Sequence, residues 1–525
     1  MRVKRVAVVL VAFCLIVSVA ACSGAGGQKE GAPANEGKGS TKDKMVITLF
    51  DLKYGEIPPK DGKGIAMINE KFNVDYRPQY VPYEDFEEKL ATLVASGNIP
   101  DIIGFDHPSG NFFKWVKQGA FLPLDDYIAN HPTLKNVPEH VWDSMKVNGH
   151  IYAIPRYFPA YHLRTPIIRK DWLDKLGLSM PTNYEELKEV AIAFTKQDPN
   201  GSGKDDTYGL VLSENINPSF AFGAYWDGTA WYHKDKDGQL IPGHIAEGSK
   251  ERIAWLADLY KRGAVNKDFA VMSYKDSHDI FFSGKGGIYA AQAYNQGKDP
   301  YESLAEIDPE AELAAIPPFE APDGTQGYTA SSSYYQMTAL SAELASDPDK
   351  VTRILEMIDF GRRYYPLGEH TPDNKDYDWY AGREGSGYQM KDGKPVGEGQ
   401  GSGLAPKHYL PDERPWPPDE SKHEFAKGYE VPIMKVMAGT LENMHNENAH
   451  YLNPFFRIYS EKHLQKGAEL DQFLLGEQTK MIAGQKPLAE WDEMVQQYLQ
   501  KGGADIVKEV NEALKAGNIS GEWEK

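Results

Sequence analysis

Side chains that carry oxygen recur at every second position between residues 198 and 206, where the sequence reads DPNGSGKDD. Such spacing lets one short loop surround a single cation. Counted from Asp198, the pattern follows the calcium loop of an EF-hand through its ninth position, and Gly203 is the sixth-position glycine. We therefore predict a structural Ca²⁺ ion, with these donors: Asp198, Asn200, Ser202, the main-chain carbonyl of Lys204, and Asp206.

Two departures from the calcium-loop pattern leave a second interpretation open. Ser202 replaces the usual Asp or Asn at the fifth position, and the twelfth position is Gly209, so no bidentate glutamate closes the site. The alternative is a polar loop between a helix and a strand that binds no ion.

Cys22 is a candidate site of covalent lipid modification. It follows a positive segment with Arg2, Lys4 and Arg5, an apolar run from residue 6 to residue 19, and two alanines. This run is too short to span a bilayer stably and is typical of a secretion signal. The order Val-Ala-Ala-Cys resembles the lipobox of bacterial lipoproteins. We expect cleavage after residue 21 and acylation of Cys22 by fatty acids such as palmitate, which anchors the protein at the extracellular face of the cell membrane. The alternative is ordinary secretion with Cys22 unmodified.

Composition narrows the classes of function. Removal of residues 1–21 leaves 525 − 21 = 504 residues and changes the net charge from −19 to −22, because three positive charges are lost. This sign argues against nucleic acid as a partner. Cys14 lies in the signal and Cys22 would be acylated, so no disulfide is expected. Tyr (30), Phe (21) and Trp (10) are plentiful, and flat faces with polar tips suit sugar ligands.

Other catalytic patterns are weak or missing in the sequence. The run Gly201-Ser-Gly-Lys204 lacks the spacing of a phosphate-binding loop. His445, Glu447 and His450 are one residue out of register for two zinc ligands on one helical face, and we expect them to be solvated. No G-x-S-x-G segment occurs. A glycosidase needs only two carboxylates, so the sequence does not exclude one by counting.

The order of predicted elements indicates an α/β fold. Residues 23–44 are rich in Gly, Ser, Ala and Lys and read as a flexible tether, and the first strand begins at Met45. Strands and helices then alternate, which favours a mostly parallel sheet. Thr182 and Glu185 form a T-x-x-E capping box that predicts a helix ending at residue 196 or 197, and Asp237-Gly238 predicts a hairpin. Residues 371–420 have little periodicity, and long irregular segments often carry function.

Several of these segments together resemble the family-1 extracellular solute-binding proteins, and in particular their large oligosaccharide-binding lipoprotein branch. The resemblance runs through KLATLVASGNIPDII (89–103), GAFLPLDDY (119–127), GHIYAIP (149–155), the stretch from Ile168 to Gly209, and Trp491 to Leu514. It implies a two-lobe periplasmic-binding-protein-like fold with a hinge. One lobe would contain residues 45–160 and about 325–370, and the other residues 161–324 and about 371–525. It also implies a calcium ion in the loop described above.

The resemblance further implies a non-enzymatic protein that binds a carbohydrate between its lobes and delivers it to the permease of an ABC importer. We expect a monomer. Candidate ligand-binding residues combine aromatic faces with polar groups near the expected cleft: Tyr54, Arg156, Tyr157, Trp226, Trp231 and Tyr232, then Trp379, Tyr380, Arg383 and Trp416. Two other functions stay open: a surface glycosidase or other glycan-processing enzyme, and a sugar sensor for a membrane kinase.

Overall fold

The computed structural model describes residues 44–519, except residues 55, 130, 161–164, 217–221, 291–298, 392, 421–422, 424–432, 434 and 518. Cys22, the signal and most of the tether lie outside the described residues. Residues 45–525 form one compact unit of the chain. None of the helices in the described part is long and apolar enough to cross a membrane.

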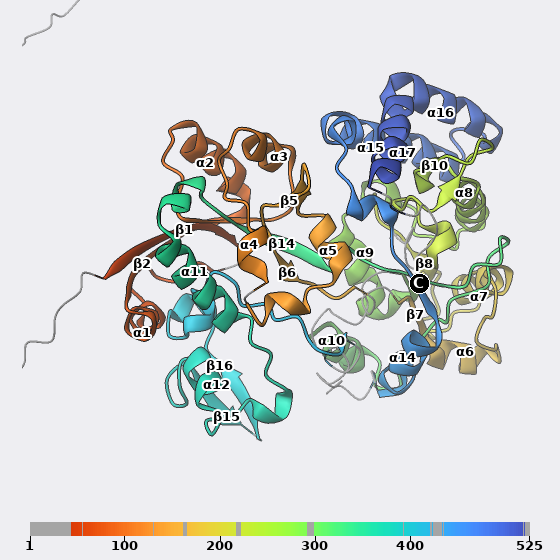
Figure 1. Cartoon of the computed structure of the whole chain (residues 1–525). Helices are drawn as coiled ribbons and strands as arrows, with labels where there is room; N and C mark the ends of the chain where they lie inside the picture. The colour runs from red at the N-terminus through yellow and green to blue at the C-terminus, as the bar shows by residue number, and fades with distance from the viewer. Residues whose placement is uncertain are drawn as a thin grey trace, which may run out of the picture. The chain divides into compact units, whose positions relative to one another are not determined.

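A five-stranded sheet organises the N-terminal lobe. Its strand order is β2 (Val74–Pro82), β1 (Met45–Lys53), β3 (Ile102–Phe105), β14 (Tyr334–Leu340) and β6 (Ile154–Tyr157). Alternate residues of β1 face two separate cores, with Ile47 and Leu49 in one and Phe50 and Leu52 in the other. Both faces are therefore covered, one by α1 (Lys63–Phe72) and α11 (Pro348–Gly361), the other by α2 (Tyr83–Ala95) and α3 (Gly110–Lys117) (Figure 1).

A second sheet organises the C-terminal lobe, in the order β12 (Leu313–Ala315), β7 (Ile167–Arg169), β11 (Gly286–Tyr289) and β8 (Tyr208–Val211). One core joins this sheet to α6 (Lys170–Leu176), α7 (Tyr184–Lys196), α8 (Glu247–Lys261), α15 (Glu461–Ile482), α16 (Trp491–Tyr498) and α17 (Ala504–Ala516). The other core includes residues of α10 (Asp299–Ile307) and α14 (Lys435–Glu447). The α/β fold with two sheet-centred lobes is therefore present.

The described residues also form shorter helices and strands. They are α4 (Asp125–Ile128), α5 (Glu139–Asp143), α9 (Tyr274–Ile280), α12 (Lys375–Tyr380), and four two-stranded pairs: β4 (Lys146–Val147) with β5 (His150–Ile151), β9 (His233–Lys234) with β10 (Leu240–Ile241), β13 (Gly327–Thr329) with β17 (Ala449–Tyr451), and β15 (Tyr388–Lys391) with β16 (Lys394–Gly397). The antiparallel β9–β10 pair encloses Asp237-Gly238 and confirms the predicted hairpin.

The prediction of mostly parallel sheets is confirmed, with one antiparallel strand in each sheet. In the N-terminal lobe β14 runs antiparallel to its neighbours β3 and β6, and in the C-terminal lobe β7 runs antiparallel to its neighbours β11 and β12. Strand β14 follows a long excursion through the other lobe, so no local crossover fixes its direction. The cap of α7 is Asn183, which accepts from the N–H of Glu186, while the Glu186 side chain accepts from Thr182. The predicted box is therefore displaced by one residue.

The segment from α12 to residue 416 packs with the N-terminal lobe, although the sequence predicts it in the C-terminal lobe. Trp379, Tyr409 and Leu410 belong to or pack against the core that contains Ile47. The Tyr76 hydroxyl donates to the main-chain carbonyl of Tyr409 at 2.7 Å. These long-range contacts bring residues 375–416 beside the strand ends of the five-stranded sheet, which becomes important for the site.

Candidate ligand-binding site

Polar and aromatic side chains gather at one edge of the five-stranded sheet. Strands β1, β3 and β6 end at Lys53, Phe105 and Tyr157, and antiparallel β14 begins at the same edge with Tyr334. Ligands of α/β proteins commonly bind where parallel strands end. A pocket of about 100 Å³ opens here, lined by Asp51, Leu52, Lys53, Tyr54, Arg156, Tyr335, Gln336, Gln400, Leu410, Pro411, Asp412, Glu413 and Arg414.

A buried ion pair forms part of this pocket. Arg156 donates from Nη2 to Asp51 Oδ2 at 2.7 Å, from Nε to Thr338 Oγ1 at 3.1 Å, and from Nη1 to Gln336 Oε1 at 3.3 Å. Burial alone lowers the pKa of Arg156, but the nearby carboxylates of Asp51 and Asp412 outweigh it and raise that pKa. Gly104 leaves space for the Asp51 carboxylate, since a Cβ at residue 104 would lie 1.8 Å from Asp51 Oδ1.

A second buried ion pair holds the loop that carries Arg414. The side chains of Arg362 and Asp412 are fully buried, and Arg362 Nη1 donates to Asp412 Oδ2 at 2.6 Å and to the Pro155 carbonyl at 2.7 Å. Asp412 also accepts from the N–H of Arg414 at 2.9 Å. The end of α11 therefore fixes the position of residues 412–414 next to β6.

Two exposed tyrosines stack on each other beside the smaller pocket, and Tyr54 lines it. Tyr54 is 50% exposed and Tyr83 is 44% exposed, and their rings stack at 4.9 Å with an interplanar angle of 23°. The Tyr54 hydroxyl donates to Asp106 Oδ1 at 2.8 Å. Burial and this hydrogen bond raise the pKa of Tyr54. Burial raises the pKa of Asp106, but hydrogen bonds from His107 and Tyr54 outweigh it and lower that pKa overall, so Asp106 is ionised at neutral pH.

A larger pocket of about 730 Å³ adjoins the first, and Gln400, Glu413 and Arg414 line both. Its other lining residues are Arg363, Tyr364, Tyr365, His370, Tyr377, Tyr380, Pro395, Lys407, His408, Pro415 and His423. The guanidinium of Arg414 lies 4.3 Å from the ring centroid of Tyr335. The two pockets together have the size and the mixture of aromatic and polar groups that suit a small polar ligand.

The structure places the predicted ligand-binding residues in different surroundings. Tyr54 and Arg156 line the smaller pocket and Tyr380 lines the larger one. Trp226 and Trp231 are each only 3% exposed; Trp226 stacks on Tyr184 at 3.9 Å and Trp231 stacks on Phe455 at 5.5 Å. Tyr232 is 2% exposed, and its hydroxyl donates to the Tyr451 carbonyl. Tyr232 is a packing surface of the C-terminal lobe, while Trp226 and Trp231 also line cavities of that lobe, of about 840 Å³ and about 340 Å³ respectively.

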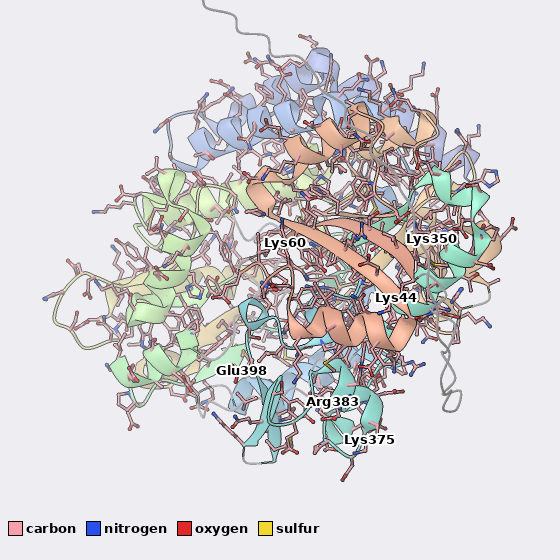
Figure 2. All side chains as sticks on the ribbon, turned by 90° about the vertical axis from the view of Figure 1, so that its left-hand side faces the viewer. Lys44, Lys60, Lys350, Lys375, Arg383 and Glu398 are labelled. Carbon is pink, nitrogen blue, oxygen red and sulfur yellow. The ribbon has the colours of Figure 1, made fainter. Side chains whose placement is uncertain are left out.

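The remaining predicted aromatic and arginine residues lie around the N-terminal core. Tyr157 is buried edge-on against Trp416 at 5.5 Å. Trp379 packs edge-on against Phe360 at 5.0 Å, with the Lys71 ammonium 4.8 Å from its ring centroid. Arg383 is exposed with a left-handed φ of 69°, and Figure 2 labels it at the surface of the same segment as Lys375.

Oxygen donors of the 198–206 loop do converge. Asp198 accepts from the N–H groups of Ser202 at 3.1 Å and Gly203 at 2.9 Å, while Asp206 accepts from Ser202 Oγ at 2.8 Å and Asn200 Nδ2 at 3.2 Å. The bonds from Ser202 and Asn200 lower the pKa of Asp206. Among the described residues, no group of three or more His, Cys, Asp and Glu side chains could hold a metal. The donors here are two carboxylates, an amide and a hydroxyl, which are hard oxygen ligands of the kind calcium takes.

The prediction for the three residues of H-x-E-x-x-H is wrong in one respect, because His445 is buried. Its ring stacks on Tyr328 at 4.2 Å, and its nitrogens lie 2.7 Å from Thr165 Oγ1 and 3.0 Å from His450 Nε2. The strand pair β13–β17 brings Tyr328 beside this helix end, a contact between segments far apart in the sequence.

Sequence reasoning missed several residues of the site, namely Tyr83, Asp106, Tyr335, Lys407, Glu413 and Arg414. Asp106 directly follows β3, just as Tyr54 directly follows β1, and because ligands of α/β proteins often bind at strand ends, this position was a signal for Asp106. Lys407, Glu413 and Arg414 lie in the irregular 371–420 segment that was singled out for function, without any local pattern that distinguishes them from their neighbours.

Two sheet-centred lobes, with a pocket at the strand ends of one of them, are the architecture of a two-lobe binding protein. Residues 60–343, more than half of the chain, match the family of bacterial extracellular solute-binding proteins. The chain belongs to this family.

Individual relatives cover almost the whole chain. Lipoprotein LipO of Bacillus subtilis (strain 168) is 26% identical over 511 residues, covering 92% of this chain and 94% of LipO. The polygalacturonan/rhamnogalacturonan-binding protein YtcQ of the same organism is 28% identical over 512 residues, covering 95% of this chain and 98% of YtcQ. The solved structure of a solute-binding protein from Bifidobacterium longum infantis ATCC 15697, described as HMO-binding and associated with an ABC transporter, aligns with a TM-score of 0.67 and 17% identity, covering 91% of this chain and 100% of that chain.

Proposed function

We propose that this protein is the substrate-binding lipoprotein of an ABC importer and that it binds a carbohydrate, most simply an oligosaccharide, at the strand-end pockets described above. The observation that carries the proposal is the pairing of an exposed Tyr54–Tyr83 surface with charged and amide side chains at one sheet edge, in a chain that belongs to the solute-binding family. The relative YtcQ, which is named for binding polygalacturonan and rhamnogalacturonan, supports the same class of ligand.

The proposed binding mode follows from the chemistry of sugars. The apolar face of a sugar ring stacks on Tyr54 and Tyr83, while Asp106, Gln336 and Arg414 offer acceptors and donors to its hydroxyls. Arg156 is held by three hydrogen bonds and acts as a positioning residue beneath the pocket. The C-terminal lobe would close over the ligand, and its added contacts favour the closed state that a permease recognises. Tyr157, Trp226, Trp231, Tyr232, Trp379 and Arg383 remain predicted contacts.

The membrane anchor is part of the proposal. Cys22 follows a signal of the lipobox type, and the relative LipO bears the name lipoprotein. Two acyl chains on Cys22 would hold the protein at the outer face of the membrane. Residues 23–44 would act as a flexible tether between this anchor and the folded part.

Calcium is the proposed structural ion of the 198–206 loop. Asp198, Asn200, Ser202 and Asp206 would hold it together with the Lys204 carbonyl, and the ion would neutralise the two carboxylates and stiffen the connection between α7 and β8. The loop lies at the end of a helix and away from the strand-end pockets, so the ion would take no part in sugar binding.

Thermal unfolding against a panel of oligosaccharides tests the function. A ligand at 100 times its dissociation constant should stabilise the protein by about 2.7 kcal/mol. We expect a stable upward shift with one class of glycan and full recovery of the intact sugar. Consumption of the glycan during the assay would instead establish a glycan-processing enzyme, and the absence of any shift across the panel would refute carbohydrate binding. Loss of uptake after deletion of the gene would separate import from sensing.

A further inference from the structure

The strand-end pockets are locally basic in a strongly acidic protein. The chain has a net charge of −19, yet the larger pocket is lined by Arg363, Lys407 and Arg414 and by a single carboxylate, that of Glu413. The smaller pocket adds Lys53 beside two carboxylates that are already neutralised, since Asp51 pairs with Arg156 and Asp412 with Arg362. Positive charge is therefore concentrated in the larger pocket, whereas the rim of the smaller pocket carries the ionised carboxylate of Asp106.

Two of these cations lack a carboxylate partner. Within the part of the chain that the structure describes, neither Lys407 nor Arg414 forms an ion pair. Lys407 is half-buried, and burial lowers its pKa even though Glu413 acts in the opposite direction. The Arg414 guanidinium donates to the Tyr335 hydroxyl and lies over the ring of that residue, and no carboxylate of the described residues pairs with it. Arg363, by contrast, pairs with Asp376 at 2.6 Å.

Histidines extend the same surface. His370 stacks on Tyr377 at 4.4 Å, and its Nε2 lies 2.9 Å from the Tyr365 carbonyl. The Nε2 atom of His408 is buried and has no hydrogen-bond partner among the described residues. Burial lowers the pKa of both rings, so they stay neutral at pH 7 unless an anion binds beside them. The pocket thus offers further nitrogen atoms to an acidic group.

From this arrangement we infer that the ligand is an acidic oligosaccharide, one whose sugar rings carry negative groups that bind Lys407 and Arg414. The inference rests on the proposed function and narrows its ligand. Ammonium and guanidinium groups form their strongest hydrogen bonds with anionic oxygens, and Arg matches a carboxylate with two parallel bonds. A neutral sugar would cover these cations without neutralising them, and burial of an unpaired charge is costly. The rings of Tyr365 and Tyr380, which line the larger pocket, supply the faces for the sugar itself.

Isothermal titration of the full chain in mild detergent tests the inference with matched probes. The first probe is a galacturonic acid tetramer, the second its fully methyl-esterified form, and the third a neutral galactose tetramer. A sulfated galactose tetramer distinguishes carboxylate from sulfate as the anionic group. At 0.15 M salt, where charges beyond about 8 Å are screened, we expect an acidic tetramer to bind at least 10-fold more tightly than both neutral tetramers.

Variants that remove a positive charge test whether the preference for the acidic tetramer arises in the pocket. Lys407→Gln and Arg414→Gln should each weaken binding of the acidic tetramer at least 5-fold. Lys508→Gln, which removes the same charge from an exposed position on α17, should leave it unchanged. Equal binding of acidic and neutral tetramers, or equal losses in all three variants, would overturn the inference while the carbohydrate function stands. Binding of no tetramer, together with a silent oligosaccharide panel in thermal unfolding, would overturn both.

Discussion

Replacement of Asp51 by Asn removes one charge from the buried pair beneath the proposed site. Asp51 is 2% exposed and Arg156 is 6% exposed, and Arg156 Nη2 lies 2.7 Å from Asp51 Oδ2. The variant keeps the shape of the side chain and one oxygen that accepts a hydrogen bond. It leaves the Arg156 charge buried, with Asp412 as the other carboxylate that raises its pKa.

The magnitude follows from the geometry. At 2.7 Å and an effective dielectric constant of about 20, the attraction between the two charges is roughly 6 kcal/mol. In the variant, the remaining side-chain oxygen at position 51 still accepts a hydrogen bond from Arg156, which contributes about 1 kcal/mol. Asp412 compensates a further part, so we expect Asp51→Asn to lower the free energy of unfolding by about 3 to 5 kcal/mol, the range found when one partner of a buried pair is removed.

Urea unfolding, followed by circular dichroism and tryptophan fluorescence, measures this loss. The matched control is Asp85→Asn, which breaks an exposed pair with Lys89 at 2.8 Å and should cost less than about 0.5 kcal/mol. The double variant Asp51→Asn, Arg156→Gln should recover part of the loss because no unpaired charge remains buried. A loss for Asp51→Asn no larger than that of the control would refute the reasoning that this pair is a buried, mutually dependent unit.

Four further changes test other parts of the molecule. Tyr54→Ala removes half of the exposed aromatic surface and should weaken oligosaccharide binding about 10-fold or more in titration, without a change in the unfolding midpoint of the free protein. Cys22→Ser should move the protein from the membrane fraction to the culture medium. Calcium should raise the unfolding temperature of the wild type over that in a chelator, and Asp198→Ala should abolish the difference. Burial, aided by Arg252, lowers the pKa of His244 to about 4, so below pH 6.5 the unfolded chain binds a proton that the folded protein does not. The stability that neutral His244 contributes is therefore present above pH 6.5, and about 3 kcal/mol of it is lost as the pH falls to 4. Urea unfolding at pH 7 and pH 4 should show this loss in the wild type, and the loss should be missing from the His244→Asn variant.

Local sequence patterns predicted the elements well where neighbouring residues decide the structure. The apolar residues Val46, Ile47, Leu49 and Leu52 predicted β1, and the Asp237-Gly238 turn predicted the β9–β10 hairpin. Strand direction was not predictable in the same way, because β14 enters its sheet after the chain has passed through the second lobe. Its pairing depends on tertiary contacts that no short window of sequence contains.

The residues of the candidate site were likewise predictable only in part from the sequence. Tyr54 was predictable because it directly follows the first strand, and Arg156 because the resemblance placed it near the expected cleft. Arg414 was not, because it reaches the pocket only through the Arg362–Asp412 pair and the packing of Tyr409 against β2. Residue type and the resemblance indicated Trp226 and Trp231 as sugar platforms. The sequence did not show that Tyr184 and Phe455, from distant positions in the chain, stack on these two rings.

A crystal structure of the protein with the oligosaccharide that produces the largest thermal shift tests carbohydrate binding at the strand-end pockets most directly. We predict sugar rings against Tyr54 and Tyr83, with a hydroxyl or acidic group within hydrogen-bond distance of Arg414. Sugar bound elsewhere, for instance only in the cavity lined by Trp231 and Asp471 in the C-terminal lobe, would contradict this placement of the site.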